Sequence, residues 1–270
     1  MELLTVIPIG QYYPGESFLH RVDPRTKILF IVAYVILLFL VRHPLMIIGF
    51  SLPSLLAVIF SGIPLSYQWK AYRGILLMIL LFGLFQMFYI REGFLLGKIF
   101  GLSLYSEGVK EAALTALRLT DLLLLTSLLT FTTSSIALTE GLERLLSPFS
   151  SLGLPVGEIA LMMTIAIRYI PTLLEEMEKI MKAQMARGAD FESRNLRKRV
   201  NALFPLIVPL FVNSFRRAEE LALSMEARGY RGGRGRTRRY TLTFTHRDGW
   251  VVLLLLLMGL ALIGERVWLY

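Results

Sequence analysis

Five apolar runs dominate the chain and decide what it can fold into. They cover residues 28–41, 45–60, 74–90, 109–131 and 250–263. A helix crosses the bilayer core with roughly 20 apolar residues, so the shortest runs need polar ends such as Thr26 and Lys27, or a thinned bilayer. Because 55% of the 270 residues are hydrophobic, an integral membrane protein is favoured over a soluble domain. The sequence predicts an all-α fold with about five transmembrane helices.

The stretch 132–248 has a different pattern, since it is charged and amphipathic. It predicts three helices: one from the Ser134 region to about Leu146, one starting near Pro155, and one over about 200–228. We therefore divide the chain into 1–131 with four spans, 132–248 with the amphipathic helices, and 249–270 with the last span. Two further expectations concern detail: the prolines 171, 205 and 209 disturb their helices, and the i,i+4 pairs Glu175–Lys179 and Glu178–Lys182 form.

The basic residues give an orientation. Lys and Arg total 29 against 20 Asp and Glu, and they concentrate in 132–248, in Arg21–Lys27 and in Lys70–Arg73. Short loops rich in Lys and Arg stay in the cytoplasm. We expect a multi-pass protein of the cell membrane with its N-terminus and the amphipathic helices in the cytoplasm.

Two of the amphipathic helices end in the same three residues, Ala-Arg-Gly. The copies are Ala186, Arg187 and Gly188, and Ala227, Arg228 and Gly229. A single copy is explained by capping, because Gly adopts the left-handed conformation and Arg favours the negative end of the helix dipole. The repeat favours a second interpretation, in which each exposed guanidinium is offered to a carboxylate of a partner protein.

Charged residues inside the apolar pattern have structural or functional interpretations. Arg118 and Asp121 lie in the fourth run, three residues apart, where they can pair on one helix face. A structural pair is favoured over a transport role, because charges at bilayer depth usually pair. Arg168 precedes Pro171 and either holds a kink or contacts a partner, and packing is favoured.

Several classes of catalyst and binding protein are excluded or disfavoured. The chain has no Cys, its three His are far apart, and it lacks the Gly-x-x-x-x-Gly-Lys-Ser/Thr loop that binds nucleotide phosphates. We expect no enzyme activity, no metal and no cofactor. The Arg-Gly tract 231–239 leaves an alternative, a membrane-anchored basic adaptor or RNA-binding protein, although a linker at anionic headgroups explains it better. Arg194 and its basic neighbours 197–199 are interpreted as a solvated or headgroup-facing turn.

The chain resembles the transmembrane T component of energy-coupling factor transporters, which import vitamins and metal ions with ATP-binding cassette ATPases. The matching segments extend over nearly the whole chain, and the two Ala-Arg-Gly ends are the most specific. They are 17–27, 138–148, 167–172, 183–188 and 227–230.

The resemblance implies a coupling subunit that itself does no catalysis. Its partners would be two ABC ATPase subunits, a membrane substrate-capture (S) component and the lipid bilayer, with no nucleic acid. The two Ala-Arg-Gly ends would dock on the two ATPases. The apolar faces of the cytoplasmic helices would form the platform for the S component, tentatively through Ile159, Met163, Ile170, Met177, Leu210 and Phe211.

Overall fold

The computed structural model describes residues 12–41, 43–99, 102–191, 193, 195–232 and 244–269. They divide into two compact units, which we call the bundle unit and the helix-pair unit. The bundle unit holds the described residues up to Leu142 and those from Phe244 onward, and the helix-pair unit holds those from Glu143 to Gly232. Residues 233–239 of the predicted Arg-Gly tract and Arg194 lie outside the described residues.

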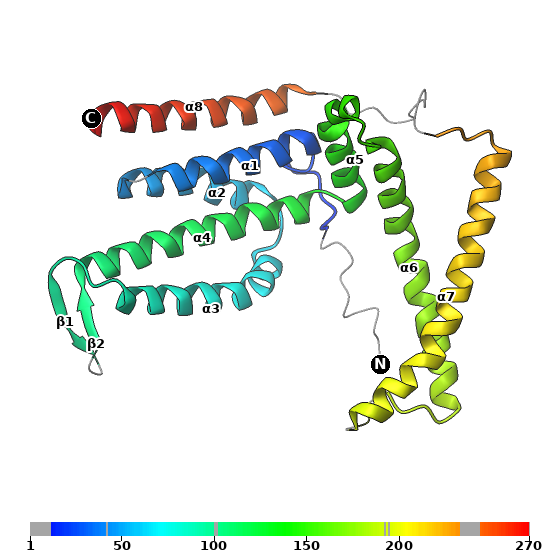
Figure 1. Ribbon diagram of the computed structural model, residues 1–270. Helices are drawn as coiled ribbons and strands as arrows, with labels where there is room; N and C mark the ends of the chain where they lie inside the picture. The colour runs from blue at the N-terminus through cyan, green and yellow to red at the C-terminus, as the bar shows by residue number, and fades with distance from the viewer. Residues whose placement is uncertain are drawn as a thin grey trace. The chain divides into compact units, whose positions relative to one another are not determined.

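The bundle unit is built from helices that lie side by side, with α8 beside α1 and α3 beside α4 (Figure 1). Its elements are α1 (Pro24–Leu40), α2 (Pro44–Phe60), α3 (Leu65–Tyr89), β1 (Leu95–Ile99), β2 (Leu102–Tyr105), α4 (Ser106–Thr132), most of α5 (Ser135–Leu146) and α8 (His246–Leu269). Pro24 and Pro44 occupy first-turn positions, where a missing N–H costs nothing.

The helix-pair unit follows the end of α5. It contains the 3-10 helix η2 (Ser147–Leu152) and two long helices, α6 (Val156–Ala186) and α7 (Leu196–Ala227). The starts and ends expected from Pro148, Pro155 and the two Ala-Arg-Gly segments agree with these bounds. Both long helices continue through their internal prolines, Pro171 in α6 and Pro205 and Pro209 in α7.

Four described helices are long and apolar enough to cross a membrane: α3, α4, α6 and α8. The helix α2 is apolar but shorter, and α1 has 17 residues. The five predicted runs therefore coincide with α1, α2, α3, α4 and α8. The length and hydropathy of α6 were not expected to suit a membrane span, because the sequence analysis placed this helix among the amphipathic ones.

Two hydrophobic cores hold the bundle unit together. The first joins α1, α2, α4 and α8 around the fully buried Tyr34, Leu38 and Ile47. The second packs α3 against the last turns of α4 around Phe131, which contacts the rings of Tyr67 and Tyr72. Both cores include residues of α4, so this helix is the centre of the bundle.

A short antiparallel hairpin, β1–β2, connects α3 to α4 and is the only β-sheet among the described residues. Leu95 pairs with Tyr105 and Gly97 with Leu104, so one residue bulges between them. Gly93, with φ 91°, makes the turn into the hairpin. The hairpin was not predicted, but the fold remains all-α in class.

Candidate functional site

The two Ala-Arg-Gly ends lie at opposite ends of the α6–α7 pair. The helices run antiparallel and cross one another, so the end of α6 lies near the start of α7 (Figure 1). With 31 and 32 residues, each helix is about 45 Å long at 1.5 Å per residue. The two ends are thus separated by roughly one helix length, and one compact socket cannot hold both.

The first end is a Schellman cap. The Gly188 N–H donates to the Met185 carbonyl at 3.0 Å, and the Ala189 N–H donates to the Gln184 carbonyl at 3.0 Å. Gly188 has φ 88°, the left-handed conformation that this cap requires. Arg187 is therefore the last residue before the chain reverses direction.

The second end repeats this geometry bond for bond. The Gly229 N–H donates to the Glu226 carbonyl at 2.8 Å, and the Tyr230 N–H donates to the Met225 carbonyl at 3.0 Å. Gly229 has φ 73°. The repeated sequence thus produces a repeated backbone structure, with Arg228 in the place that Arg187 occupies in the first.

Capping accounts for the glycines but not for the guanidinium groups. Arg187 and Arg228 are both exposed, and neither forms an ion pair with any described residue. A Cβ added to Gly188 or Gly229 would meet nothing within 4 Å, so the surroundings of each end are open. Each end presents a planar cation on a rigid support, which suits bidentate binding of a carboxylate.

The residues expected to form a platform divide into two groups. Ile159, Met163 and Ile170 on α6 and Phe211 on α7 are exposed. Met177 and Leu210 are partly buried. The structure brings no partner to any of them, so their role stays a prediction.

A longer apolar stripe on α7 was missed by the sequence reasoning. Its members are exposed and recur every three or four residues, which places them on one face of the helix. They are Val200, Leu203, Phe204, Ile207, Val208, Phe211, Val212 and Phe215. The spacing of these apolar residues is present in the sequence. It was not interpreted as a helix face because the prolines at 205 and 209 predicted a disturbed helix.

Polar contacts connect α6 and α7 where they cross. Glu176 accepts a hydrogen bond from Asn213 Nδ2 at 2.6 Å and forms an ion pair with Arg217 at 3.2 Å. Glu178 pairs with Lys182 at 2.7 Å, as expected. The expected Glu175–Lys179 pair is absent from the ion pairs of the described residues.

In the bundle unit, the segment 17–27 forms a polar cluster that we call the knot. Asp23 caps α1 through the Arg25 N–H at 2.9 Å, and its own N–H donates to Asp248 Oδ1 at 2.9 Å. Lys27 Nζ donates to the Thr132 carbonyl at 3.0 Å and to Thr133 Oγ1 at 2.8 Å. The knot therefore fastens the starts of α1 and α8 to the end of α4.

The position of the knot matters because the chain leaves and re-enters the bundle unit there. α5 begins two residues after Thr133, and its Gly141 packs closely on α1, since a Cβ would lie 3.0 Å from that of Pro24. On the return, Phe244 lies under the Arg25 guanidinium at 5.0 Å. Both covalent links to the helix-pair unit thus meet the bundle at one place.

The charged residues of α4 have partners other than those expected. Asp121 is 1% exposed and accepts hydrogen bonds from Ser51 Oγ and Ser54 Oγ, each at 2.6 Å. Arg118 donates to the Val41 carbonyl at 2.8 Å. The expected Arg118–Asp121 ion pair is therefore wrong, because both side chains reach across to neighbouring parts of the bundle.

Arg168 on α6 is exposed, and its role at the kink or with a partner stays a prediction.

Comparison with known proteins identifies the family. Residues 15–239 match the family model CbiQ, described as cobalt transport protein. The energy-coupling factor transporter transmembrane protein EcfT of Brevibacillus brevis is 50% identical over 264 residues, which cover 95% of this chain and 98% of that protein. Those of Thermosediminibacter oceani and Bacillus subtilis are 49% and 44% identical, covering 90% and 96% of this chain and 91% and 97% of theirs.

The match includes the segment 17–27, both Ala-Arg-Gly ends and the helices between them. The chain therefore belongs to the CbiQ/EcfT family, the transmembrane components of energy-coupling factor transporters.

Proposed function

We propose that this transmembrane component couples ATP hydrolysis by two ATPase subunits to substrate release from a membrane-embedded S component. The two Ala-Arg-Gly ends dock on the two ATPases, one end on each. The apolar faces of α6 and α7 carry the S component. The chain does no chemistry on the substrate, and ATP hydrolysis belongs to the partners because this sequence has no phosphate-binding loop.

The observation that carries the proposal is the pair of equivalent ends. Identical caps with exposed arginines at the two ends of one antiparallel pair suit two similar sockets on two similar subunits. When ATP draws the subunits together, the ends approach, and α6 must rotate against α7 about the contact at Glu176. A coupling mechanism needs such an element with two arrangements, whose balance both sites affect.

The α7 stripe supports the second contact. Its eight exposed apolar side chains extend along about four turns of helix. Contiguous apolar faces of this kind commonly mark protein or membrane contacts. A sliding partner suits such a face, since dispersion and burial are non-directional and impose no single register.

We infer that the helix-pair unit lies in the cytoplasm of a multi-pass cell-membrane protein, although α6 by itself is long and apolar enough to cross a bilayer. The basic balance of 132–248 supports this orientation. The knot then lies at the cytoplasmic ends of α1, α4 and α8, where it anchors both links against the motion of the helix pair.

The test is a detergent pull-down of the co-expressed complex with its two ATPases and its S component. We compare the wild type with Arg187→Ala/Arg228→Ala, and use Arg216→Ala as the matched control, because Arg216 is exposed on α7 away from its end. Losing a charge-assisted contact at each end should weaken ATPase retention by roughly a hundredfold or more in the double variant. The control should retain both ATPases.

Equal retention in the wild type and the double variant would mean that the arginines only cap their helices. The two single variants test whether each end contacts a different ATPase subunit. If the two ends serve different subunits, Arg187→Ala and Arg228→Ala should each weaken one ATPase more than the other.

A further inference from the structure

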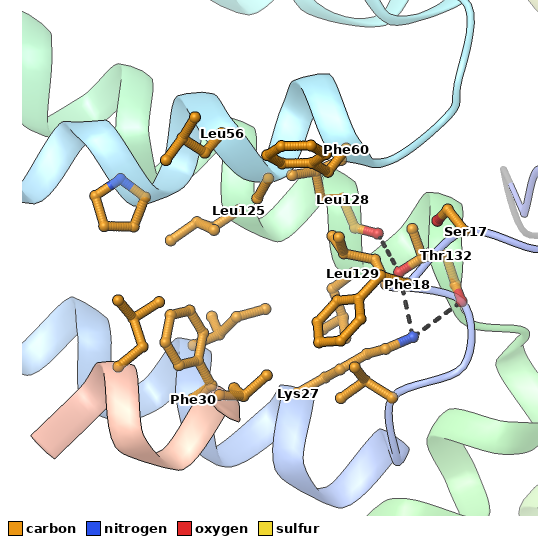
Figure 2. Close-up of a pocket in the computed structure, with 17 residues that line it drawn as sticks. Ser17, Phe18, Lys27, Phe30, Leu56, Phe60, Leu125, Leu128, Leu129 and Thr132 are labelled. Carbon is orange, nitrogen blue, oxygen red and sulfur yellow. Dashed lines mark hydrogen bonds between the residues drawn. The ribbon is translucent and has the colours of Figure 1, made fainter. Parts of the chain in front are cut away.

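A cavity of about 660 Å³ lies inside the bundle unit, between α1 and α8 on one side and α2 and α4 on the other (Figure 2). This volume is in the range of pockets that hold organic ligands, about 300–1,000 Å³. Its walls are formed by apolar side chains such as Phe30, Leu56, Leu125 and Leu254. Polar groups lie only at one end, where Ser17, Lys27 and Thr132 meet.

The cavity adjoins the buried first core of the bundle. Near the end of α1 and the start of α2, Leu38, Val41 and Ile47 are fully buried in this core. Tyr34 adds a hydrogen bond to the Phe50 carbonyl at 2.7 Å. Further from this core, Phe30 of α1 and Leu56 and Ala57 of α2 line the open space. The cavity is therefore a built feature of the bundle and continues its first core.

The polar end of the cavity is already satisfied. Lys27 Nζ donates to the Thr132 carbonyl, Thr132 Oγ1 and Thr133 Oγ1 at 3.0, 3.3 and 2.8 Å. Thr132 Oγ1 donates to the Leu128 carbonyl, and Ser17 Oγ bonds His20 Nδ1 at 2.7 Å. In Figure 2 the Lys27 stem runs along the wall while its nitrogen points towards Thr132. The hydrogen-bond donors at this end are therefore used within the chain, and a polar ligand would find no free donor here.

The cavity opens to the side of the bundle. Its rim residues Phe60, Leu56 and Phe18 are 63%, 42% and 42% exposed. Two of its walls, α4 and α8, are long and apolar enough to span a membrane, and the three rim side chains are apolar as well. Water is disfavoured in such a space, since it needs two to four polar partners.

We propose that the cavity binds one acyl chain of a bilayer phospholipid. The chain enters beside Phe18 and lies along α1 and α4, with the ester groups near Ser17. Because the walls contact methylene groups and the polar end has no unused donor, recognition depends on the chain and not on the headgroup. The lipid fills the gap between α1 and α2 and so completes the core that the side chains leave open.

The test uses the full chain in nanodiscs of egg phosphatidylcholine with a trace of phosphatidylcholine that carries a diazirine in one acyl chain. After illumination, mass spectrometry compares labelling of Leu125, Leu129 and Leu254 with labelling of the exposed α3 residues Leu77 and Leu81. The α3 face contacts bulk lipid and serves as the internal reference. We expect higher labelling in the cavity, unchanged when the probe is a phosphatidylglycerol with the same chain.

Two variants fill the cavity from opposite walls, Ala57→Phe on α2 and Val251→Phe on α8. Excluding about two methylene groups should lower cavity labelling roughly tenfold relative to α3. Ala113→Phe is the matched control, because Ala113 is exposed on α4 and does not line the cavity.

Three results would overturn the proposal. The first is wild-type labelling no higher in the cavity than on α3, which needs no variant to fold. The second is unchanged labelling in both filled variants. The third is a fall of cavity labelling to the α3 value when the S component is bound, which would assign the space to a protein contact.

Discussion

The bundle unit and the helix-pair unit are both built from long helices, but they differ in how many of their apolar side chains are buried. In the bundle, two cores bury large side chains, and the buried charges Asp121 and Lys27 are bonded within the chain. In α6 and α7 the described apolar side chains that are buried number three, Val156, Ala160 and Leu206, while the α7 stripe and both arginines are exposed. The bundle buries its own cores, whereas the helix pair leaves its apolar stripe exposed, as the proposed partner contacts require.

The comparison is sharpest for two phenylalanines. Phe131 in the bundle is fully buried, and Phe211 in the stripe is 61% exposed. Phe131→Ala should lower the free energy of unfolding by roughly 3–5 kcal/mol and the thermal midpoint in detergent by roughly 10 °C. Phe211→Ala should cost about 0.5 kcal/mol or less. Binding of the S component should show the reverse order for the folded protein, with Phe211→Ala the weaker binder.

Equal losses of thermal stability would contradict the division into a self-contained bundle and a surface for partners. A stable Phe131→Ala would show that α3 and α4 are held mainly by lipid. A destabilised Phe211→Ala would show that the stripe packs within the chain.

The knot gives the next largest effect. Lys27→Met keeps the stem but removes the cation, which leaves the Thr132 carbonyl and two threonine hydroxyls without their donor. We expect a loss of roughly 3 kcal/mol in the free energy of unfolding. Lys110→Met is the control, since Lys110 is exposed and its pair with Glu107 is worth less than about 1 kcal/mol.

The measurement that locates the effect is protease sensitivity of the two links. If the knot anchors them, Lys27→Met should expose cleavage sites around α5 and the start of α8 before the bundle unfolds. Cleavage spread evenly over the chain would mean that Lys27 contributes to global stability alone.

Asp121 should have a smaller effect. The hydroxyls of Ser51 and Ser54 also lie 2.9 and 2.8 Å from carbonyl oxygens of α2, so each single hydroxyl proton has another acceptor when the acid is removed. Because hydrogen bonds between membrane helices average about 0.6 kcal/mol, Asp121→Asn should cost about 1 kcal/mol in thermal unfolding and Asp121→Ala slightly more. A loss as large as that for Lys27→Met would reveal a role beyond packing of α2 on α4.

The sequence predicted best what local rules determine. The ends of α5, α6 and α7 follow from Pro148, Pro155 and the two glycines, since caps and prolines act within a few residues. Gly188 and Gly229 could be assigned to the left-handed conformation without any structure. The repeat of the cap, and with it the candidate site, was readable for the same reason.

What the sequence missed depends on distant partners. Asp121 was assigned to Arg118 three residues away, but its serines lie 67 and 70 residues distant. Lys27 looked like a polar helix end, because Thr132 and Thr133 are more than 100 residues further along. The hairpin β1–β2 lies in a short apolar run broken by glycines, where periodicity cannot separate strand from loop.

The smallest predicted effect is that of substitutions at Gly188, which distinguish a capping role of the Ala-Arg-Gly ends from a docking role. Gly188→Ala forces a Cβ into the left-handed region, which costs about 1 kcal/mol locally, while Gly188→Asn costs less because Asn tolerates that conformation. Thermal unfolding should barely respond to either variant, because the end is exposed and open around the glycine. ATPase binding, measured by titration of the purified subunits, should weaken roughly fivefold for Ala and return towards wild type for Asn. If Asn fails as badly as Ala, the socket contacts the glycine directly, and close backbone approach matters more than the shape of the cap.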